Sequence, residues 1–253
     1  MSFGAALAVL AAGLAAGTVN AVVGSGSLIT FPTLLALGYP AVTANVSNTI
    51  GLVPGAISGT IGYRRELAGQ GPRVRSLGVA SAAGGVSGAL LLLALPGSVF
   101  RRVVPVLILV ACALVALQPR LAARRLSAGD AHNKARRHGG GALHGAIFAT
   151  GIYGGYFGAA QGVILIALLG IFLEDSLQRL NGLKNALATI VNGIAALLFM
   201  ALAHVAWGPA GLLAIGSAVG GQLGARAGRR IPAPVLRVVI VVVGVAVAVR
   251  LLF

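Results

Sequence analysis

Long apolar runs with short polar interruptions recur along the whole chain. The first run extends from Phe3 to Leu37, and as one helix it would measure about 50 Å, well beyond the ~30 Å core of a bilayer. The stretch Gly24-Ser-Gly-Ser27 interrupts this run and leaves a piece, Leu28–Leu37, that is roughly 15 Å long as a helix. The pattern therefore predicts a helix that breaks inside the membrane, where unwound backbone is tolerated only if it is buried or lines a cavity.

Ten apolar segments follow from the same pattern, five in each half of the chain. The first half contains the segments Phe3–Val23, Leu28–Leu37, Ala41–Tyr63, Leu77–Leu95 and Val99–Leu117. The second half contains Ala142–Phe157, Val163–Leu173, Asn181–His204, Pro209–Ala225 and Pro234–Phe253. We expect a first transmembrane repeat at 1–118, a basic linker at 119–141 and a second transmembrane repeat at 142–253.

The two halves match residue by residue at several places, which indicates an internal duplication. The matched positions are Gly17 with Gly151, Gly24 with Gly158, Asn45 with Asn181, and Gly84-Gly85 with Gly220-Gly221. Because five is an odd number of segments, the second half would start on the opposite side of the membrane and run inverted. The predicted fold is an all-α polytopic membrane protein of two inverted repeats, each with a broken or half-length helix.

Composition and charge agree with this interpretation. The chain is 58% hydrophobic and 9% charged, whereas soluble domains carry about 25% charged residues. If the linker 119–141 is cytoplasmic, the inverted arrangement leaves only Arg101, Arg102 and Arg250 outside, and a plain eight-span arrangement separates the charges less cleanly. Because basic loops follow the positive-inside rule, the net charge of +15 requires no nucleic acid partner.

Polar residues at the depth of the membrane are the candidate site. They belong to the two breaks and to the helices that follow them: Asn20, Gly24, Ser25, Gly26 and Ser27; Asn45, Ser47, Asn48 and Thr49; Gly158, Gln161 and Gly162; Asn181, Lys184 and Asn185. We expect them to converge near the bilayer centre, where inverted-repeat transporters bind substrate. Helix N-termini offer N–H groups and a positive dipole end, which suits an anion. Snorkelling of Lys184 to the interface, and capping or interhelical bonding by the Asn side chains, are left open.

Several classes of site are disfavoured. The four acidic residues, Glu66, Asp130, Glu174 and Asp175, all fall in predicted loops, so no carboxylate is expected in the membrane for a cation or a proton relay. The single Cys112 supports neither a disulfide nor a cysteine metal site. The chain has no Gly-x-Ser-x-Gly, His-Glu-x-x-His or Walker A motif. We therefore expect no enzyme, metal or cofactor.

At these positions the chain resembles the sulfite exporter TauE/SafE family of membrane transporters. The motifs that carry the resemblance are Gly17-x-x-Asn20-x-x-x-Gly24-Ser-Gly-Ser-x-x-x-x-Pro32, Ala44-Asn45-x-x-Asn48-Thr49, Tyr63-Arg64-Arg65, Gly154-Gly155-Tyr-Phe-Gly158-Ala-Ala-Gln161-Gly162 and Arg179-Leu-Asn181-Gly-Leu-Lys184-Asn185. Serines replace two glycines that the family often has in the first break. The resemblance implies movement of sulfite or organosulfonates across the bacterial inner membrane.

The leading hypothesis is a secondary transporter or facilitator for a small anion, in which the two halves rock around the site in alternating access. Its expected partners are the anionic substrate and the lipid bilayer, and a homo-oligomeric state is left open. Two alternatives remain at this point: a transporter of another neutral or charged solute, and a non-transporting membrane scaffold.

Overall fold

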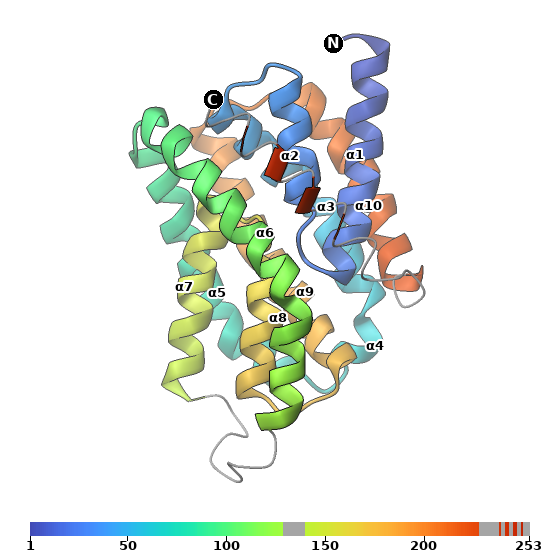
Figure 1. Cartoon of the computed structure of the whole chain (residues 1–253), viewed down its shortest axis with the longest axis vertical. Helices are drawn as coiled ribbons and strands as arrows, with labels where there is room; N and C mark the ends of the chain where they lie inside the picture. The colour runs from blue at the N-terminus through green and yellow to red at the C-terminus, as the bar shows by residue number, and fades with distance from the viewer. Residues whose placement is uncertain (129–139, 228–237, 239–240, 243–244, 247–248, 250–253) are drawn as a thin grey trace.

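The computed structural model describes residues 1–128, 140–227, 238, 241–242, 245–246 and 249 (Figure 1). Within these residues all regular structure is helical, as the sequence predicts. The helices are α1 (Phe3–Val22), α2 (Ser27–Ala36), α3 (Ala41–Gly62), α4 (Arg64–Leu67), α5 (Gly71–Ala94), α6 (Gly97–Ala128), α7 (Gly141–Tyr156), α8 (Gln161–Phe172), α9 (Leu177–Leu202) and α10 (Trp207–Ala227).

Length and hydropathy mark four stretches of the described chain as candidate membrane spans. They are Phe3–Val22, Gly71–Ala94, Gly97–Leu117 and Leu177–Leu202. The apolar helices α2 and α8 are too short to cross a bilayer, with 10 and 12 residues. The protein is therefore an α-helical membrane protein that contains two half-length apolar helices.

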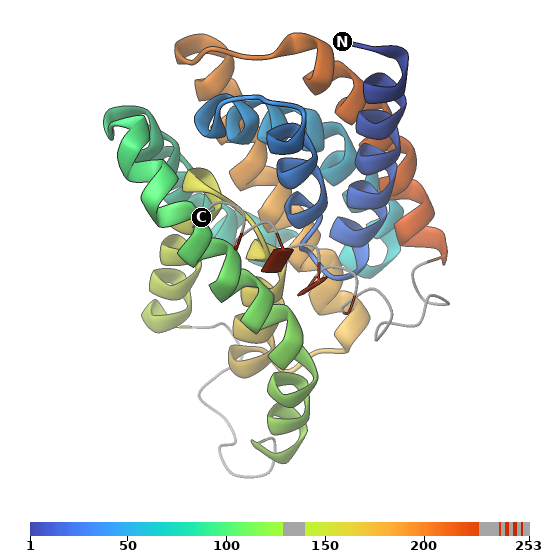
Figure 2. The same ribbon diagram turned by 45° about the horizontal axis from the view of Figure 1, so that its top comes forward.

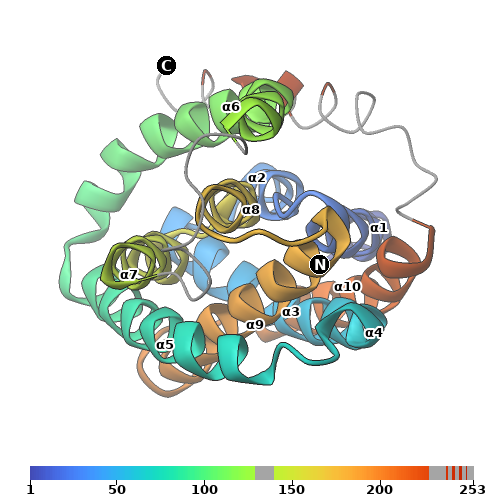
Figure 3. The ribbon, with the colours of Figure 1, turned by 90° about the horizontal axis from the view of Figure 1, so that it is seen from below.

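The two half-length helices lie end to end along the long axis of the molecule. Both begin near mid-height, and α2 runs toward the end that carries the N-terminus while α8 runs toward the opposite end (Figure 1). Seen along that axis, α2 and α8 overlap at the centre of the bundle (Figure 3). Gly24 and Gly158 precede them with φ of +88° and +74°, which glycine adopts without steric cost. The predicted break in each half is thus present.

Helices pack across the two halves at glycine-rich contacts. The N-terminal helix α1 packs on α10, and α7 packs on α5 (Figure 2). A Cβ atom on Gly17 would lie 2.8 Å from the Cα atom of Ser217, and a Cβ atom on the matched Gly151 would lie 2.9 Å from the carbonyl oxygen of Ser81. Residues that match in sequence therefore make matching contacts. The inverted orientation of the halves in a membrane stays a prediction.

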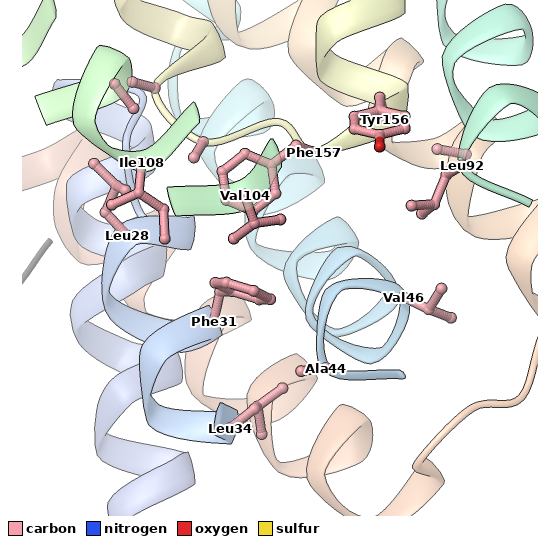
Figure 4. Packing of buried hydrophobic residues seen from close by; sticks show 14 of the residues in the cluster. Leu28, Phe31, Leu34, Ala44, Val46, Leu92, Val104, Ile108, Tyr156 and Phe157 are labelled. Atoms are coloured by element: carbon pink, nitrogen blue, oxygen red, sulfur yellow. The ribbon is translucent and has the colours of Figure 1, made fainter. Parts of the chain in front are cut away.

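An aromatic cluster closes the bundle beside the first break. The ring of Phe31 on α2 lies edge to face with Phe157, 5.3 Å between centroids, and with Phe100 on α6, 6.5 Å between centroids. Val104 and Ile108 of α6 lie near Leu28 in the same core (Figure 4). Helix α6 thus covers α2, so the half-length helix is packed inside protein.

Several helix ends differ from the prediction. Helix α6 extends through Ala128, because the Ala, Leu and Arg residues after the apolar segment favour helix although they end its hydropathy. Helix α9 begins at Leu177, where the side chain of Ser176 accepts a hydrogen bond from the N–H of Arg179. Residues 129–139 of the predicted linker, and most of the predicted last segment, lie outside the described residues.

Candidate functional site

A small cavity lies between the two helix breaks, with a volume of about 30 Å³. That volume accommodates a ligand of only a few heavy atoms, since a single water needs about 10–15 Å³ on the same measure. Its lining residues come from α1, the first break, α3, the second break, α8 and α9: Asn20, Ala21, Gly24, Ser27, Gly55, Ala56, Gly158, Gln161, Gly162, Lys184, Asn185, Ala188 and Asn192. None of them is acidic.

The two breaks touch each other through backbone. The N–H of Gly162 donates a hydrogen bond to the carbonyl oxygen of Gly24 at 3.1 Å. A Cβ atom on Gly162 would lie 2.5 Å from the Cα atom of Gly24. Both positions therefore need glycine, and the contact holds the N-terminal end of α8 against the first break.

Lys184 is the basic residue of the cavity lining, and its side chain is buried. The residue is 1% exposed, which rules out snorkelling to an interface. Its Nζ donates hydrogen bonds to the carbonyl oxygens of Asn20 at 3.1 Å and Ala21 at 3.3 Å. An ammonium group has three N–H donors, so one remains for a ligand in the cavity.

The groups that accept from Lys184 are the last carbonyls of α1. This helix ends at Val22, so its C-terminal end carries the partial negative charge of the helix dipole. The carbonyl oxygen of Ala21 also accepts hydrogen bonds from the side-chain amides of Asn181 and Asn185, at 3.3 and 3.1 Å. Half a unit of charge from the dipole offsets Lys184 only in part, and an anion in the cavity would complete the balance.

Gln161, the first residue of α8, brings an unpartnered amide to the same cavity. The residue is 2% exposed, and neither its Nε2 nor its Oε1 has a hydrogen-bond partner. A buried amide without a partner costs about 1–3 kcal/mol. A ligand in the cavity would supply the missing partner.

Most N–H groups at the starts of α2 and α8 are already used. The N–H of Gly26 donates to the side-chain oxygen of Asn20 at 2.6 Å, and that of Gln161 donates to the carbonyl oxygen of Gly158 at 3.2 Å. We expected free N–H groups at both helix starts, but Asn20, the local turns and the contact between the breaks use most of them. A ligand would therefore depend mainly on side chains and helix dipoles.

Eight expected site residues line the cavity: Asn20, Gly24, Ser27, Gly158, Gln161, Gly162, Lys184 and Asn185. The other expected residues, Ser25, Gly26, Asn45, Ser47, Asn48, Thr49 and Asn181, do not. Whether any of them binds substrate stays a prediction.

The expected residues outside the lining mainly hold helices together. Asn48 donates to the hydroxyl of Ser27 at 3.3 Å and accepts from Thr30, which joins α3 to α2. Asn45 donates to the carbonyl oxygen of Tyr156, and Ser47 accepts from the N–H of Ala206 just before α10. Thr49 donates to the carbonyl oxygen of Asn45 within α3. Asn45 and Asn48 thus make interhelical hydrogen bonds, which is one of the alternatives left open for the Asn side chains.

Five lining residues were not predicted from the sequence: Ala21, Gly55, Ala56, Ala188 and Asn192. Asn192 is the polar one among them, and it lies within an otherwise apolar run. Lys184, Ala188 and Asn192 are spaced four residues apart on α9. At this spacing the three side chains lie on one face of the helix. That spacing is the signal that could have found it.

An ion-pair cluster joins the halves at one end of the bundle. Asp175, just before α9, binds Arg73 of α5 at 2.7 Å and Arg179 at 2.9 Å. Burial raises the pKa of the Asp175 carboxyl, but the hydrogen bonds from Arg73, the Ser176 N–H and Arg179 outweigh it and hold this pKa below its usual range. Gln70 adds a hydrogen bond to the carbonyl oxygen of Arg179 at 2.9 Å.

The described residues contain no group of three or more His, Cys, Asp or Glu side chains arranged as metal ligands are. The polar atoms of the cavity are an ammonium, amides and a hydroxyl. Such a set donates hydrogen bonds to an anion, and its amide oxygens accept them.

Known proteins resemble the chain over most of its length. The probable membrane transporter protein YfcA of Escherichia coli K12 is 28% identical over 94% of this chain and 86% of its own length. The probable membrane transporter protein ORF9 of a Sinorhizobium species is 26% identical over 94% of this chain and 88% of its own. A probable membrane transporter protein of Haemophilus influenzae is 26% identical over 85% of this chain and 81% of its own.

No solved structure matches the chain. The sequence model of one family, described as sulfite exporter TauE/SafE, matches residues 9–251, which is nearly the whole chain. This protein belongs to the sulfite exporter TauE/SafE family.

Proposed function

We propose that this membrane protein is a secondary transporter or facilitator for a small anion, most specifically a sulfur-containing oxyanion. The observation that carries the proposal is Lys184, a fully buried cation that lines the cavity between the two breaks with no carboxylate beside it. A buried charge that backbone carbonyls offset only in part is costly, so a protein that keeps one has a use for it. The names of the family and of the similar proteins support transport as that use.

The size of the cavity supports a small substrate. A volume of about 30 Å³ suits an inorganic oxyanion such as sulfite better than an organosulfonate with a long carbon chain. The amide of Gln161 and the hydroxyl of Ser27 add neutral hydrogen-bonding groups around the Lys184 ammonium. Together they would replace the water that the anion loses on entry.

Alternating access would move the two halves against each other around this cavity. One end of the bundle is held by the ion pairs of Asp175, which join α5 to the loop before α9. The other side of the first break is packed by the aromatic rings of Phe31, Phe100 and Phe157. Ion pairs can exchange for water and aromatic contacts can separate, so each would act as a gate. We place the protein in the bacterial inner membrane, with the linker 119–141 cytoplasmic.

Transport in proteoliposomes tests the proposal. Purified protein is reconstituted, and uptake of radiolabelled sulfite, thiosulfate and methanesulfonate is followed in the wild type and in Lys184→Met. Methionine keeps an unbranched apolar side chain and removes the charge, so the variant is expected to fold while uptake falls at least about tenfold. Ser81→Ala is the matched control, because Ser81 is buried with an unpartnered hydroxyl but does not line the cavity.

Each outcome decides between the hypotheses. Uptake that is selective for one of these anions and lost in Lys184→Met supports the proposal. Equal uptake in both proteins contradicts the role of Lys184. Uptake of neutral or cationic solutes alone favours a different transporter, and the absence of any flux favours a membrane scaffold.

A further inference from the structure

The side chains that line the cavity determine its charge. Lys184 is the titratable side chain among them. None of the charged residues of α4, α5 and the start of α9 lines the cavity: Arg64, Arg65, Glu66, Arg73, Arg75, Glu174, Asp175 and Arg179. A singly charged anion therefore matches the site, whereas a doubly charged one would bring an unpaired negative charge into a buried space.

The amide of Gln161 adds a second requirement. It lines the cavity with both Nε2 and Oε1 unpartnered. Nε2 donates hydrogen bonds and Oε1 accepts them. An oxyanion that has lost all its acidic protons can satisfy only Nε2, because every one of its oxygens is an acceptor. An oxyanion that retains a proton can accept from Nε2 and donate to Oε1.

The position of this amide is fixed by close packing. A Cβ atom on Gly154 would lie 2.6 Å from Oε1 of Gln161, and closer still to its Cδ and Nε2. The side chain of Gln161 thus occupies space that only glycine at 154 leaves open. At 2% exposure it is shielded from bulk water, so its hydrogen-bond partners must lie in the cavity.

We propose that the cavity selects oxyanions in their singly charged, protonated form, with Lys184 pairing the charge and Gln161 accepting the hydrogen bond of the retained proton. This inference rests on the proposed anion transport and names the form of the substrate. Sulfite takes up its proton near neutral pH, so hydrogen sulfite is the form that would bind. Gln161 is then the residue that distinguishes a protonated oxyanion from a sulfonate, which has one charge but no acidic proton.

Equilibrium binding to the purified full-length protein in detergent tests this proposal with three probes. Sulfite changes between one and two charges near neutral pH, sulfate stays doubly charged, and methanesulfonate stays singly charged without a proton. The affinity for sulfite relative to methanesulfonate should rise as the pH falls through the range in which sulfite is protonated, and sulfate should bind weakly at every pH. Comparing the two affinities at each pH removes any titration of Lys184, since that would change both alike.

The variant Gln161→Met removes the amide and keeps a side chain of similar length. It should lower the affinity for hydrogen sulfite relative to methanesulfonate by about fivefold, which corresponds to one hydrogen bond. It should also flatten the pH dependence of that ratio, and Ser81→Ala should change neither. A retained single peak in size-exclusion chromatography shows that the variants are folded.

Three results overturn the proposal. The first is a pH profile for methanesulfonate identical to that for sulfite, and the second is sulfate binding as tight as that of hydrogen sulfite. The third is an equal loss of both sulfite and methanesulfonate in Gln161→Met. In each case anions still bind, so the proposed function survives. If none of the three probes binds, the proposed function fails together with this inference.

Discussion

Gly24 and Gly162 join the two broken helices through their backbones. The N–H of Gly162 donates to the carbonyl oxygen of Gly24 at 3.1 Å, and a Cβ atom on Gly162 would lie 2.5 Å from the Cα atom of Gly24. The cavity that holds Lys184 and Gln161 borders on this contact. The geometry of the candidate site therefore depends on two residues that have no side chain.

Substitution of these glycines should destabilise the protein for two separable reasons. Gly162→Ala introduces a clash with backbone, which typically costs about 1–3 kcal/mol. Gly24→Ala adds a similar clash and also a left-handed conformation at φ +88°, which costs a further ~1–2 kcal/mol. Unfolding temperatures measured in detergent should therefore fall in the order wild type, Gly162→Ala, Gly24→Ala.

Gly38 supplies the matched control for that experiment. Its φ is +87°, nearly that of Gly24, but a Cβ atom there would meet nothing within 4 Å. Gly38→Ala should lower the stability only by the cost of placing alanine in the left-handed conformation, about 1–2 kcal/mol. A Gly24→Ala protein that is no less stable than Gly38→Ala would contradict the close approach of Gly24 to Gly162.

The ion pairs of Asp175 should make stability depend on pH in the acidic range. Because its pKa in the folded protein lies below the usual value, Asp175 contributes stability that is present above the unfolded-state pKa and lost as the pH falls through the folded-state pKa. Asp175→Asn should therefore lower the unfolding temperature at neutral pH and reduce the further drop on acidification.

The adjacent Glu174 is exposed and provides the control for Asp175. Glu174→Gln should leave both the neutral-pH stability and its acid dependence close to those of the wild type. An acid dependence that is the same in Asp175→Asn and the wild type would show that the contacts with Arg73 and Arg179 contribute nothing measurable.

Accessibility labelling tests the predicted orientation in the membrane. Single cysteines at Gly140 and Gly208, placed in a Cys112→Ala background, flank α7 and the start of α10, and both positions are exposed. In intact cells an impermeant thiol reagent should label Gly208→Cys directly and Gly140→Cys only after lysis. Labelling of both positions from the same side would rule out the predicted topology.

The first break could be predicted from the sequence because the apolar run that contains it is longer than a bilayer is thick. The run from Phe3 to Leu37 exceeds a bilayer, and glycine and serine mark where it must break. The second break followed from its match to the first. Both breaks are present in the structure, and eight of the residues chosen around them line one cavity.

The sequence could not show which polar residues line the cavity and which bond one helix to another. Asn45 and Lys184 stand near the starts of their helices after a break, yet Asn45 bonds to the carbonyl oxygen of Tyr156 while Lys184 lines the cavity. That difference depends on where α7 ends relative to α3, which is a tertiary relationship. Asn192 is a single polar residue in an apolar run, and its only sequence signal is the spacing of eight residues that places it on the same face of α9 as Lys184.

The affinity of Lys184→Met for sulfite is the measurement that bears on the anion site without transport. The wild type, Lys184→Met and Ser81→Ala are purified in detergent, and their sulfite affinities are measured by calorimetry at one pH and salt concentration. We expect Ser81→Ala to bind as the wild type does and Lys184→Met to lose at least about tenfold in affinity, because the anion loses its one cationic partner in a buried cavity. An undiminished affinity in a folded Lys184→Met protein would contradict this expectation.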